Sequence, residues 1–457
     1  MKSSLISNRL WDDSAMTYSQ QLGTIIAQLS YDDIPEPVIY KLKTCLLYGT
    51  SMSVTASDDR ALLDAVVEMH CAPGKAKTMV LPLQLTAADA AYIDAYRMCS
   101  RGQNDTFADI VAHPGCIVIP ALLAIAQECQ ANGRQVLTAM AAGYECLASI
   151  ATGASEAVVK NRFRATSVFG VFAAAAAVSK LLGLDAVQTA NALGLASQLS
   201  AGTMQCWGEG TPEWRLQVAN AARGGVIAAR LAQKGFPAAS KALEGDSGLY
   251  ATFASNTPVA PPQWNWQTPS VVYKPLPGCL INQGPLYQLL TLQRQHHFAV
   301  TEVKSIEVTL SPRNANYPGT KNYGPFDSPT GAIMSCAFML ATGLRDGTLK
   351  ITDFDEHHGP GTIHELSRCI SVYESEEITD WGSKIVITLN NATVLTDEIS
   401  DLSRFAFEWE EAEGNLAAMT NEWPFSDSPT RYQKVRNLIQ NFENAQSVDA
   451  LLDLLRP

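Results

Sequence analysis

The chain has 457 residues, of which 47% are hydrophobic and 17% are charged. This length exceeds what one compact core normally holds and indicates two or three domains, and the apolar content excludes a disordered chain. The net charge of −12, without any block of lysine or arginine, excludes a nucleic-acid partner, because binding to the phosphate backbone needs clustered cations.

Helical periodicity dominates the chain up to residue 260. The spacing of apolar residues predicts helices over Gln20–Leu29, Ala87–Met98, Cys116–Cys129 and Gln135–Ile150, and Pro35 opens one more. The first part of the chain is therefore predicted to be a helical domain.

Two later helices of this part are rich in small residues, at Phe172–Ser179 and Thr189–Ser197. Small side chains on both faces suit helices that pack against several neighbours inside a bundle. The last helix before the helical pattern ends is predicted over Leu216–Lys234, with Gly235 as the residue that terminates it.

A proline-rich stretch at Asn256–Gln263 marks a domain boundary. Helix and strand patterns alternate beyond it, with elements predicted at Pro285–Gln293, Val303–Leu310, Thr330–Ala341, Lys384–Asn390 and Thr393–Thr396. The chain is helical again after Ser403, and the final helix at Val448–Leu455 is expected to pack on the first domain. The predicted fold is mainly α with an inserted α+β domain: a helical domain over 1–262 and 404–457, and a smaller α+β lid domain over 263–403.

The sequence also predicts where the protein works. None of the ten cysteines forms a C-x-x-C pair, which is typical of free thiols in a reducing compartment. Met1–Met16 lacks the apolar segment of a secretory signal, and the longest apolar run, Ser167–Ser179, is shorter than the ~20 residues that cross a bilayer. We therefore expect a soluble cytoplasmic protein with no membrane partner.

The richest polar segment is 102–115, with the sequence GQNDTFADIVAHPG between two predicted helices. His113 lies where the second helix begins, and backbone N–H groups and the helix dipole favour anions there. An imidazole in that place can transfer a proton beside a bound carboxylate. The simpler interpretation is a capping loop, with Asp105 or Asp109 as the N-cap.

This segment resembles the D-F-x-D-T…H-P-S/G motif of the MmgE/PrpD family, which includes 2-methylcitrate dehydratase, cis-aconitate decarboxylase and iminodisuccinate epimerase. Four further motifs of that family follow in the same order. They are Phe163–Gly170 (F-H-x-T-x-x-x-G), Leu216–Ala222 (L-H-x-G-x-A-A), Leu243–Tyr250 (L-E-G-x-x-G-F-Y) and Tyr273–Cys279 (K-x-Y/F-P-x-C, with Leu276 in place of the aromatic residue). The ordered set covers most of the chain, which is identified as a divergent member of the family.

The resemblance implies a homodimer and a polar cleft between the domains that binds a small carboxylate substrate without a cofactor. It also implies roles for three residues that match the family's motifs. His113 would transfer the proton, Thr106 would hydrogen-bond the substrate, and Lys274 would pair with a carboxylate or protonate a carbanion. Asp105 matches the aspartate before the threonine and is a further catalytic candidate.

Several positions depart from the family pattern. They are Gly102 for an aspartate, Arg164 for a histidine, Trp214 for a lysine, Gln217 for a histidine, and Gln283 near an expected histidine. The last four are predicted to bind substrate. Arg164 would supply a permanent cation with a bidentate fork, and Trp214 a large apolar face, while Gly102 removes a carboxylate that could act as a base.

These departures favour a cleft that keeps one anion anchor, Arg164 with Lys274, and is more apolar beside Trp214. We expect a lyase or isomerase that dehydrates, decarboxylates or epimerises an acid larger or more apolar than cis-aconitate, in a specialised biosynthetic pathway. Two alternatives stay open. One is a cyclase or rearrangement catalyst with Trp214 as a shaping wall, and the other is a non-catalytic dimeric binding protein.

Other candidate segments are weaker. Asp353–His358 holds acids and histidines, but they are nearly consecutive, which is typical of a solvated loop and not of a closed metal shell. Trp207–Gly210 is either an ordinary turn between helices or a loop that lines the cleft near Trp214. His70 and His364 have no predicted partner. No metal site is expected.

Overall fold

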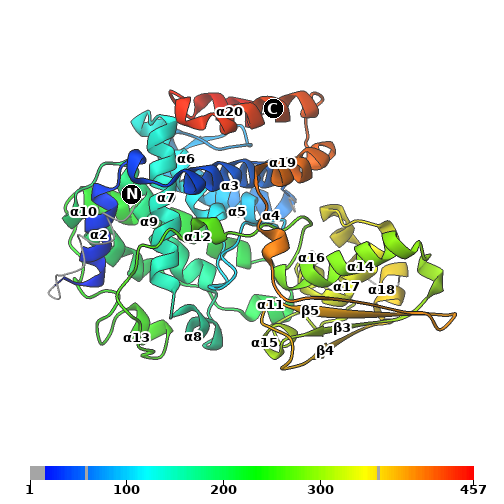
Figure 1. Ribbon diagram of the computed structural model, residues 1–457. Helices are drawn as coiled ribbons and strands as arrows, with labels where there is room; N and C mark the ends of the chain where they lie inside the picture. The colour runs from blue at the N-terminus through cyan, green and yellow to red at the C-terminus, as the bar shows by residue number, and fades with distance from the viewer. Residues whose placement is uncertain (1–15, 57–59, 358–360, 457) are drawn as a thin grey trace.

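The computed structural model describes residues 16–56, 60–357 and 361–456. The N-terminal stretch used above to predict location, up to residue 15, lies outside these ranges, as does His358. Figure 1 shows a large helical part, which contains both ends of the described chain, beside a smaller part that contains the main sheet.

The first helical elements form a bundle around α9. They are α2 (Tyr18–Gln28), α3 (Glu36–Val54), α4 (Arg60–Met69), α5 (Ala87–Cys99), α6 (Gly115–Cys129), α7 (Gly133–Ala151), α8 (Ser155–Lys160), α9 (Ala165–Leu181), α10 (Ala186–Ala196), α11 (Gln205–Glu209), α12 (Trp214–Gln233) and α13 (Leu249–Phe253). α9 packs against α6, α7, α10 and α12. Its alanines at 173–177 are fully buried, and their small size allows this close approach on several sides, as predicted.

The predicted helices of this part begin and end close to the expected residues. Gly235 follows α12 with a φ of +84°, the left-handed conformation that ends many helices. The features that were not predicted are α4, whose residues are mostly exposed, the short helices α8, α11 and α13, and a hairpin of β1 (Pro73–Lys77) and β2 (Gln84–Leu85).

The second part holds a four-stranded sheet in the order β4-β3-β5-β6. Its strands are β3 (Val303–Leu310), β4 (Ile370–Glu374), β5 (Ser383–Leu389) and β6 (Val394–Ile399), and its longer helices are α14 (Gln283–His296), α16 (Pro329–Met334), α17 (Cys336–Asp346) and α18 (Thr362–Ser367). β5 pairs antiparallel with β3 and β6, and β4 pairs parallel with β3. The alternating apolar residues of β5 belong to a core shared with α14 and α17. Figure 1 shows these helices on one face of the sheet, and the predicted fold class, mainly α with a smaller α+β unit, is confirmed.

Two predictions in this part were incomplete. The helix expected over Thr330–Ala341 is two helices, α16 and α17, separated by Ser335. Its hydroxyl accepts a hydrogen bond from the backbone N of Phe338 and donates one to the carbonyl of Asn322, so the serine caps α17 and does not continue α16. Strand β4 was missed, because its alternation is limited to two buried residues, Ile370 and Val372, which is too short a pattern to indicate a strand.

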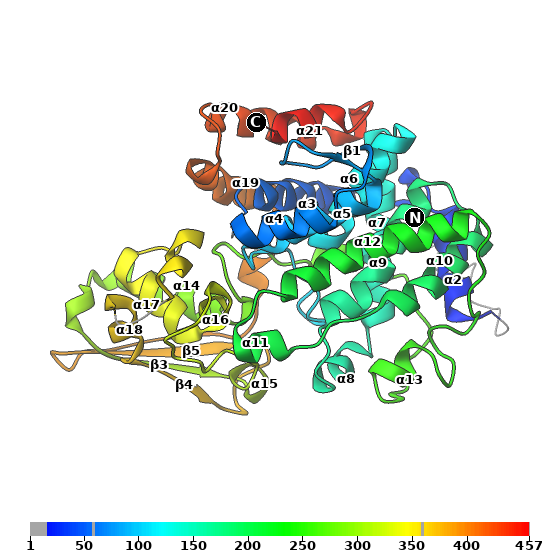
Figure 2. The same cartoon turned by 180° about the vertical axis from the view of Figure 1, so that it is seen from behind.

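After β6 the chain returns to the bundle through α19 (Trp409–Ala418), α20 (Ser428–Gln440) and α21 (Asp449–Leu455). α19 and α20 pack on α3, as Figures 1 and 2 show, and residues 402–455 share one hydrophobic core with the bundle. The exact domain boundaries stay a prediction. Within the three described ranges, no helix has both the length and the apolar character that crossing a membrane requires.

Candidate active site

A cavity lies where the helical bundle meets the α+β unit. The bundle contributes the polar loop at 102–113 and the first turns of α9 and α12, and the α+β unit contributes residues 313, 314, 317, 333, 334 and 381. Its volume is about 70 Å³, which exceeds the ~10–15 Å³ that one water molecule needs. The cavity can therefore hold a compact small molecule.

The structure brings most of the predicted site residues to this cavity. Thr106, His113, Arg164, Trp214 and Lys274 all line it, and Gly102, the position that departs from the family's aspartate, lies beside them. They come from four separated segments of the chain, so the fold gathers what the sequence motifs left apart. The three other predicted residues, Asp105, Gln217 and Gln283, do not line it.

The hydrogen bonds around His113 determine which ring nitrogen carries the proton. The Thr106 hydroxyl donates its hydrogen to the carbonyl of Asn104 at 3.0 Å, so it can only accept from Nδ1 of His113, which lies 2.9 Å away. The carbonyl of Asp105, which also can only accept, lies 3.3 Å from the same nitrogen. Nδ1 therefore carries the hydrogen, and Nε2 is left with a free lone pair for a bound molecule.

The surroundings of His113 also keep its ring neutral. Burial lowers its pKa well below 6.5, and the charges of Lys274 and Arg164 act in the same direction. A neutral imidazole with a free Nε2 lone pair is equipped to accept a proton from a substrate.

Asp105 lies behind the wall of the cavity, which corrects its predicted catalytic contact. One carboxylate oxygen accepts from the backbone N of Gly115 at 2.9 Å, and the other accepts from the hydroxyl of Tyr144 at 2.6 Å. Asp105 thus caps the start of α6, as the simpler interpretation of the loop held, although it lies outside the N-cap position itself. Burial raises the pKa of this carboxyl to about 6, against the opposing effect of these hydrogen bonds.

Lys274 is buried and its ammonium group is anchored. Its Nζ donates to the carbonyl of Gly102 at 2.5 Å. Gly102 has a φ of +62°, a conformation that favours glycine, so the residue that lacks the family's carboxylate contributes a carbonyl instead. Burial lowers the pKa of Lys274 to about 8, and the nearby charge of Arg164 acts in the same direction, which allows the lysine to give up a proton near neutral pH.

Arg164 is fixed between two tryptophans. Its Nη1 donates to the carbonyl of Trp214 at 2.8 Å, and its guanidinium carbon lies 5.2 and 5.4 Å from the ring centres of Trp207 and Trp214. The Trp214 indole N–H in turn donates to the hydroxyl of Thr330 at 3.2 Å. The predicted anion anchor is therefore held in one orientation, and its apolar surroundings are as expected.

The structure decides between the two interpretations of Trp207–Gly210. Trp207 lies in the short helix α11 and lines the cavity beside Trp214, with the two ring centres 5.2 Å apart. The segment is a wall of the cavity, and Gly210 ends α11 in the left-handed conformation.

The α+β unit supplies residues that the sequence analysis missed. Arg313 and Asn314 belong to α15 (Pro312–Ala315), directly after β3, and line the cavity with Tyr317. Arg313 also forms an ion pair with Asp380 at 2.9 Å. The available signal was a Ser-Pro helix start immediately after a predicted strand, since side chains at the end of a strand collect at one edge of a sheet.

Gln217 and Gln283 bind their own surroundings and not the cavity. The Gln217 amide donates to the carbonyl of Thr203 at 2.8 Å. The Gln283 amide donates to the carbonyl of Leu276 at 3.0 Å and so braces the loop that follows Lys274. Their predicted substrate contacts are not seen, because helix orientation turns both side chains to other neighbours.

The structure shows the surroundings of His70 and tests the sequence for metal-binding groups. His70 lies 3.6 Å from a carboxylate oxygen of Asp89 and stacks on Tyr92, so it does have partners. In the parts of the chain that the structure describes, no group of three or more His, Cys, Asp and Glu side chains could hold a metal ion.

The charge of the cavity is one-sided. Its lining residues, all described, include Arg164, Lys274 and Arg313 and no aspartate or glutamate. Arg164 and Lys274, together with Arg313, whose charge is partly balanced by its ion pair with Asp380, attract a molecule with several carboxylates. A neutral His113 and a lysine able to release a proton provide both a base and an acid beside it.

Known proteins resemble the chain over most of its length. The model of the MmgE/PrpD N-terminal domain matches residues 20–261, and that of the MmgE/PrpD C-terminal domain matches residues 277–416. The chain is 25% identical to a cis-aconitate decarboxylase-like protein oryM of Aspergillus oryzae, over 95% of this chain and 96% of that protein. It is 23% identical to a cis-aconitate decarboxylase of Aspergillus terreus (94% of both chains) and 24% identical to that of Homo sapiens (82% and 80%).

Proposed function

Because the chain belongs to the MmgE/PrpD family, we propose that it is a cofactor-free lyase that acts on a small acid with several carboxylates. The observation that most supports this proposal is the cavity wall, which combines three cations, no acidic side chain and a neutral histidine. The relatives named as cis-aconitate decarboxylases support a lyase-type function. The particular reaction and the substrate are proposed from the residues of the cavity.

Decarboxylation is the reaction that these relatives favour. The bond to one carboxylate breaks, carbon dioxide leaves, and the electron pair moves onto the carbon skeleton. Arg164 and Arg313 would hold the remaining carboxylates and so stabilise that charge. The Lys274 ammonium would then give its proton to the carbon, and solvent would restore it.

The same pair of groups supports the other two reactions. In a dehydration, Nε2 of His113 would take a proton from carbon while Lys274 protonates the departing hydroxide. In an epimerisation, His113 would take the proton and Lys274 would return one to the opposite face. Which of these occurs depends on the leaving group that the substrate carries.

The cavity wall suits an acid that carries an apolar branch, in line with the expected substrate that is more apolar than cis-aconitate. That branch would lie against Trp207 and Trp214, which form the apolar part of the wall.

Proton NMR in deuterated water tests the proposal. We expect the protein to convert cis-aconitate, 2-methylcitrate or a short alkylcitrate with deuterium in the product, and His113→Gln and Lys274→Met to lose at least a hundredfold in turnover. A mild effect at His113 with a severe one for Trp214→Ala would favour the cyclisation alternative. Tight binding of every acid without turnover would favour the binding-protein alternative and contradict the proposal.

The homodimer and the cytoplasmic location stay predictions from the family resemblance and the sequence. Sedimentation velocity at several protein concentrations would test the first, and imaging of the tagged protein in its own cells would test the second.

A further inference from the structure

A second cavity lies on the other side of the segment that carries Lys274. Lys274 and Gly278 line the catalytic cavity, whereas the residues between them, Pro275 to Pro277, line the second one. Its volume is about 500 Å³, much larger than the catalytic cavity. One short stretch of chain is therefore a wall of both.

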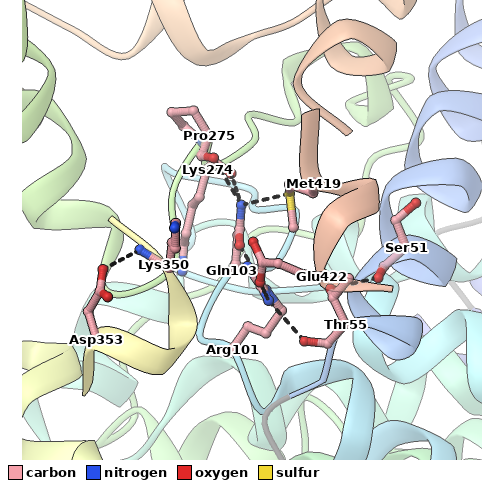
Figure 3. A network of polar contacts seen from close by, with 10 residues as sticks. All are labelled: Ser51, Thr55, Arg101, Gln103, Lys274, Pro275, Lys350, Asp353, Met419 and Glu422. Carbon is pink, nitrogen blue, oxygen red and sulfur yellow. Dashed lines mark hydrogen bonds and ion pairs between the residues drawn. The ribbon is translucent and has the colours of Figure 1, made fainter. Parts of the chain in front are cut away.

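The floor of the second cavity is built from buried polar side chains. Arg101 and Gln103 are each 1% exposed. Nε of Arg101 donates to the Gln103 side-chain oxygen at 3.0 Å, and Nη1 donates to Glu422 at 2.6 Å (Figure 3). Burying a guanidinium is costly unless it is paired, so this floor is a specific arrangement and not an accidental gap.

The rim carries a surplus of positive charge. Arg294, Lys350 and Arg404 line the cavity and are exposed, and they outnumber the one exposed acid of the lining, Glu411. In the described part of the chain, none of the three cations forms an ion pair with a carboxylate. Arg404 is held over the ring of Tyr287, 4.3 Å from its centre, and donates to its hydroxyl. In a chain with a net charge of −12, such a group of unneutralised cations attracts an anion.

Leu290, Phe405 and Phe407 supply the apolar part of the remaining wall, beside neutral polar side chains such as Asn415 and Asn421. A ligand that suits both parts has an anionic group and an apolar body. We propose that the second cavity binds a small metabolite of this kind, with its carboxylate or phosphate group against Arg294 and Arg404 and its apolar body on these side chains.

The floor connects the second cavity to the catalytic lysine. The Gln103 amide donates to the carbonyls of Lys274 and Pro275, at 3.0 and 3.1 Å (Figure 3). Pro275 to Pro277 follow Lys274 directly and line the second cavity, so a ligand seated there contacts the segment that Gln103 holds. Occupancy of the second cavity is therefore expected to shift the backbone that positions Lys274. Its effect on turnover rests on the proposed function, whereas the binding itself does not.

Titration calorimetry with phenyl phosphate and phenylacetate tests the binding, because the two probes share an apolar body and differ in the anionic group. We expect at least one to bind the full-length protein, and the Arg294→Gln/Arg404→Gln double variant to weaken it at least tenfold. Arg368→Gln, an exposed arginine outside both cavities, and Arg164→Gln in the catalytic cavity are expected to leave it unchanged. The probe that binds tells which anion the site takes. Absence of binding by both, or binding that the double variant leaves intact, overturns the proposal.

Hydrogen exchange tests the connection. The bound probe is expected to slow exchange of the amides at Leu276 and Gly278 in the wild type but not in the double variant. Binding without any change in this segment would show that the second cavity is not coupled to Lys274. If the probe binds and protects the segment while no acid is turned over, the proposed function fails and this inference stands.

Discussion

At the scale of single residues, the site depends on which protons are held where. The Thr106 hydroxyl is committed to the carbonyl of Asn104, and this fixes the tautomer of His113. Burial keeps that ring neutral and brings the pKa of Lys274 to about 8. The surroundings of the two side chains, and not their intrinsic chemistry, thus make Lys274 the acid and His113 the base.

The pH dependence of turnover follows from these shifts. A lysine with a lowered pKa is charged below about pH 8 and neutral above it, so kcat/KM is expected to fall as the pH rises through 8. No rise through pH 6.5 is expected from His113, because its ring is already neutral there. Steady-state kinetics of the wild type and of Lys274→Arg would show this, since an arginine does not titrate in that range. A decline near pH 8 that persists in Lys274→Arg would assign it to another group.

Trp214 sets the size of the cavity. Trp214→Ala is expected to reduce the free energy of unfolding by about 3–5 kcal/mol and to widen the cavity, so that KM falls for longer alkylcitrates relative to cis-aconitate. Trp264→Ala is the matched control, because Trp264 is also buried but does not line the cavity. Urea unfolding and substrate series for both variants would separate the two effects, and equal shifts in specificity would contradict the role of Trp214.

At the scale of elements, the start of α6 positions the catalytic loop. Asp105 accepts from the backbone N of Gly115, the first residue of α6, and its neighbour Thr106 contacts His113. The capping and the catalytic interpretations of this loop therefore describe one arrangement. The sequence predicted the loop and its residues because the signals are local, but it did not predict that Asp105 faces away from the cavity.

Gly115 has no room for a side chain. A Cβ there would lie 2.5 Å from a carboxylate oxygen of Asp105, so Gly115→Ala is expected to destabilise the protein by about 1–3 kcal/mol and to lower kcat by displacing His113. Gly414→Ala, in α19 with open space around it, is the control and is expected to stabilise by roughly 0.5–1 kcal/mol. Thermal unfolding and turnover of both variants check this, and an active, unaltered Gly115→Ala would remove the loop from the mechanism.

At the scale of the whole molecule, two hydrophobic cores meet at the cavity. One core spans the bundle and the returning C-terminal helices, and the other lies between the sheet and its helices. Arg164 comes from the first part and Arg313 from the second, and Lys274 lies on the segment that connects them, so the site is complete when both parts are in place.

A ligand that bridges the two parts should couple their unfolding. Without ligand, calorimetry is expected to show a broad transition or two steps, because each part has its own core. Tricarballylate, a tricarboxylate analogue, is expected to raise the unfolding temperature and to sharpen the transition. At a hundredfold excess over its Kd, it should increase the free energy of unfolding by about 3 kcal/mol. Arg313→Gln should abolish most of this effect, and a single sharp transition without ligand would contradict the two-part description.

The sequence by itself determined the fold class, most helices, three of the four main strands and the loop with Thr106 and His113. These features are encoded locally, by periodicity and by short motifs. Only the tertiary structure decided that Arg313 and Trp207 join the cavity while Gln217, Gln283 and Asp105 do not. The physical reason is that a wall built from elements far apart in the chain depends on helix orientation and packing, which no local pattern specifies.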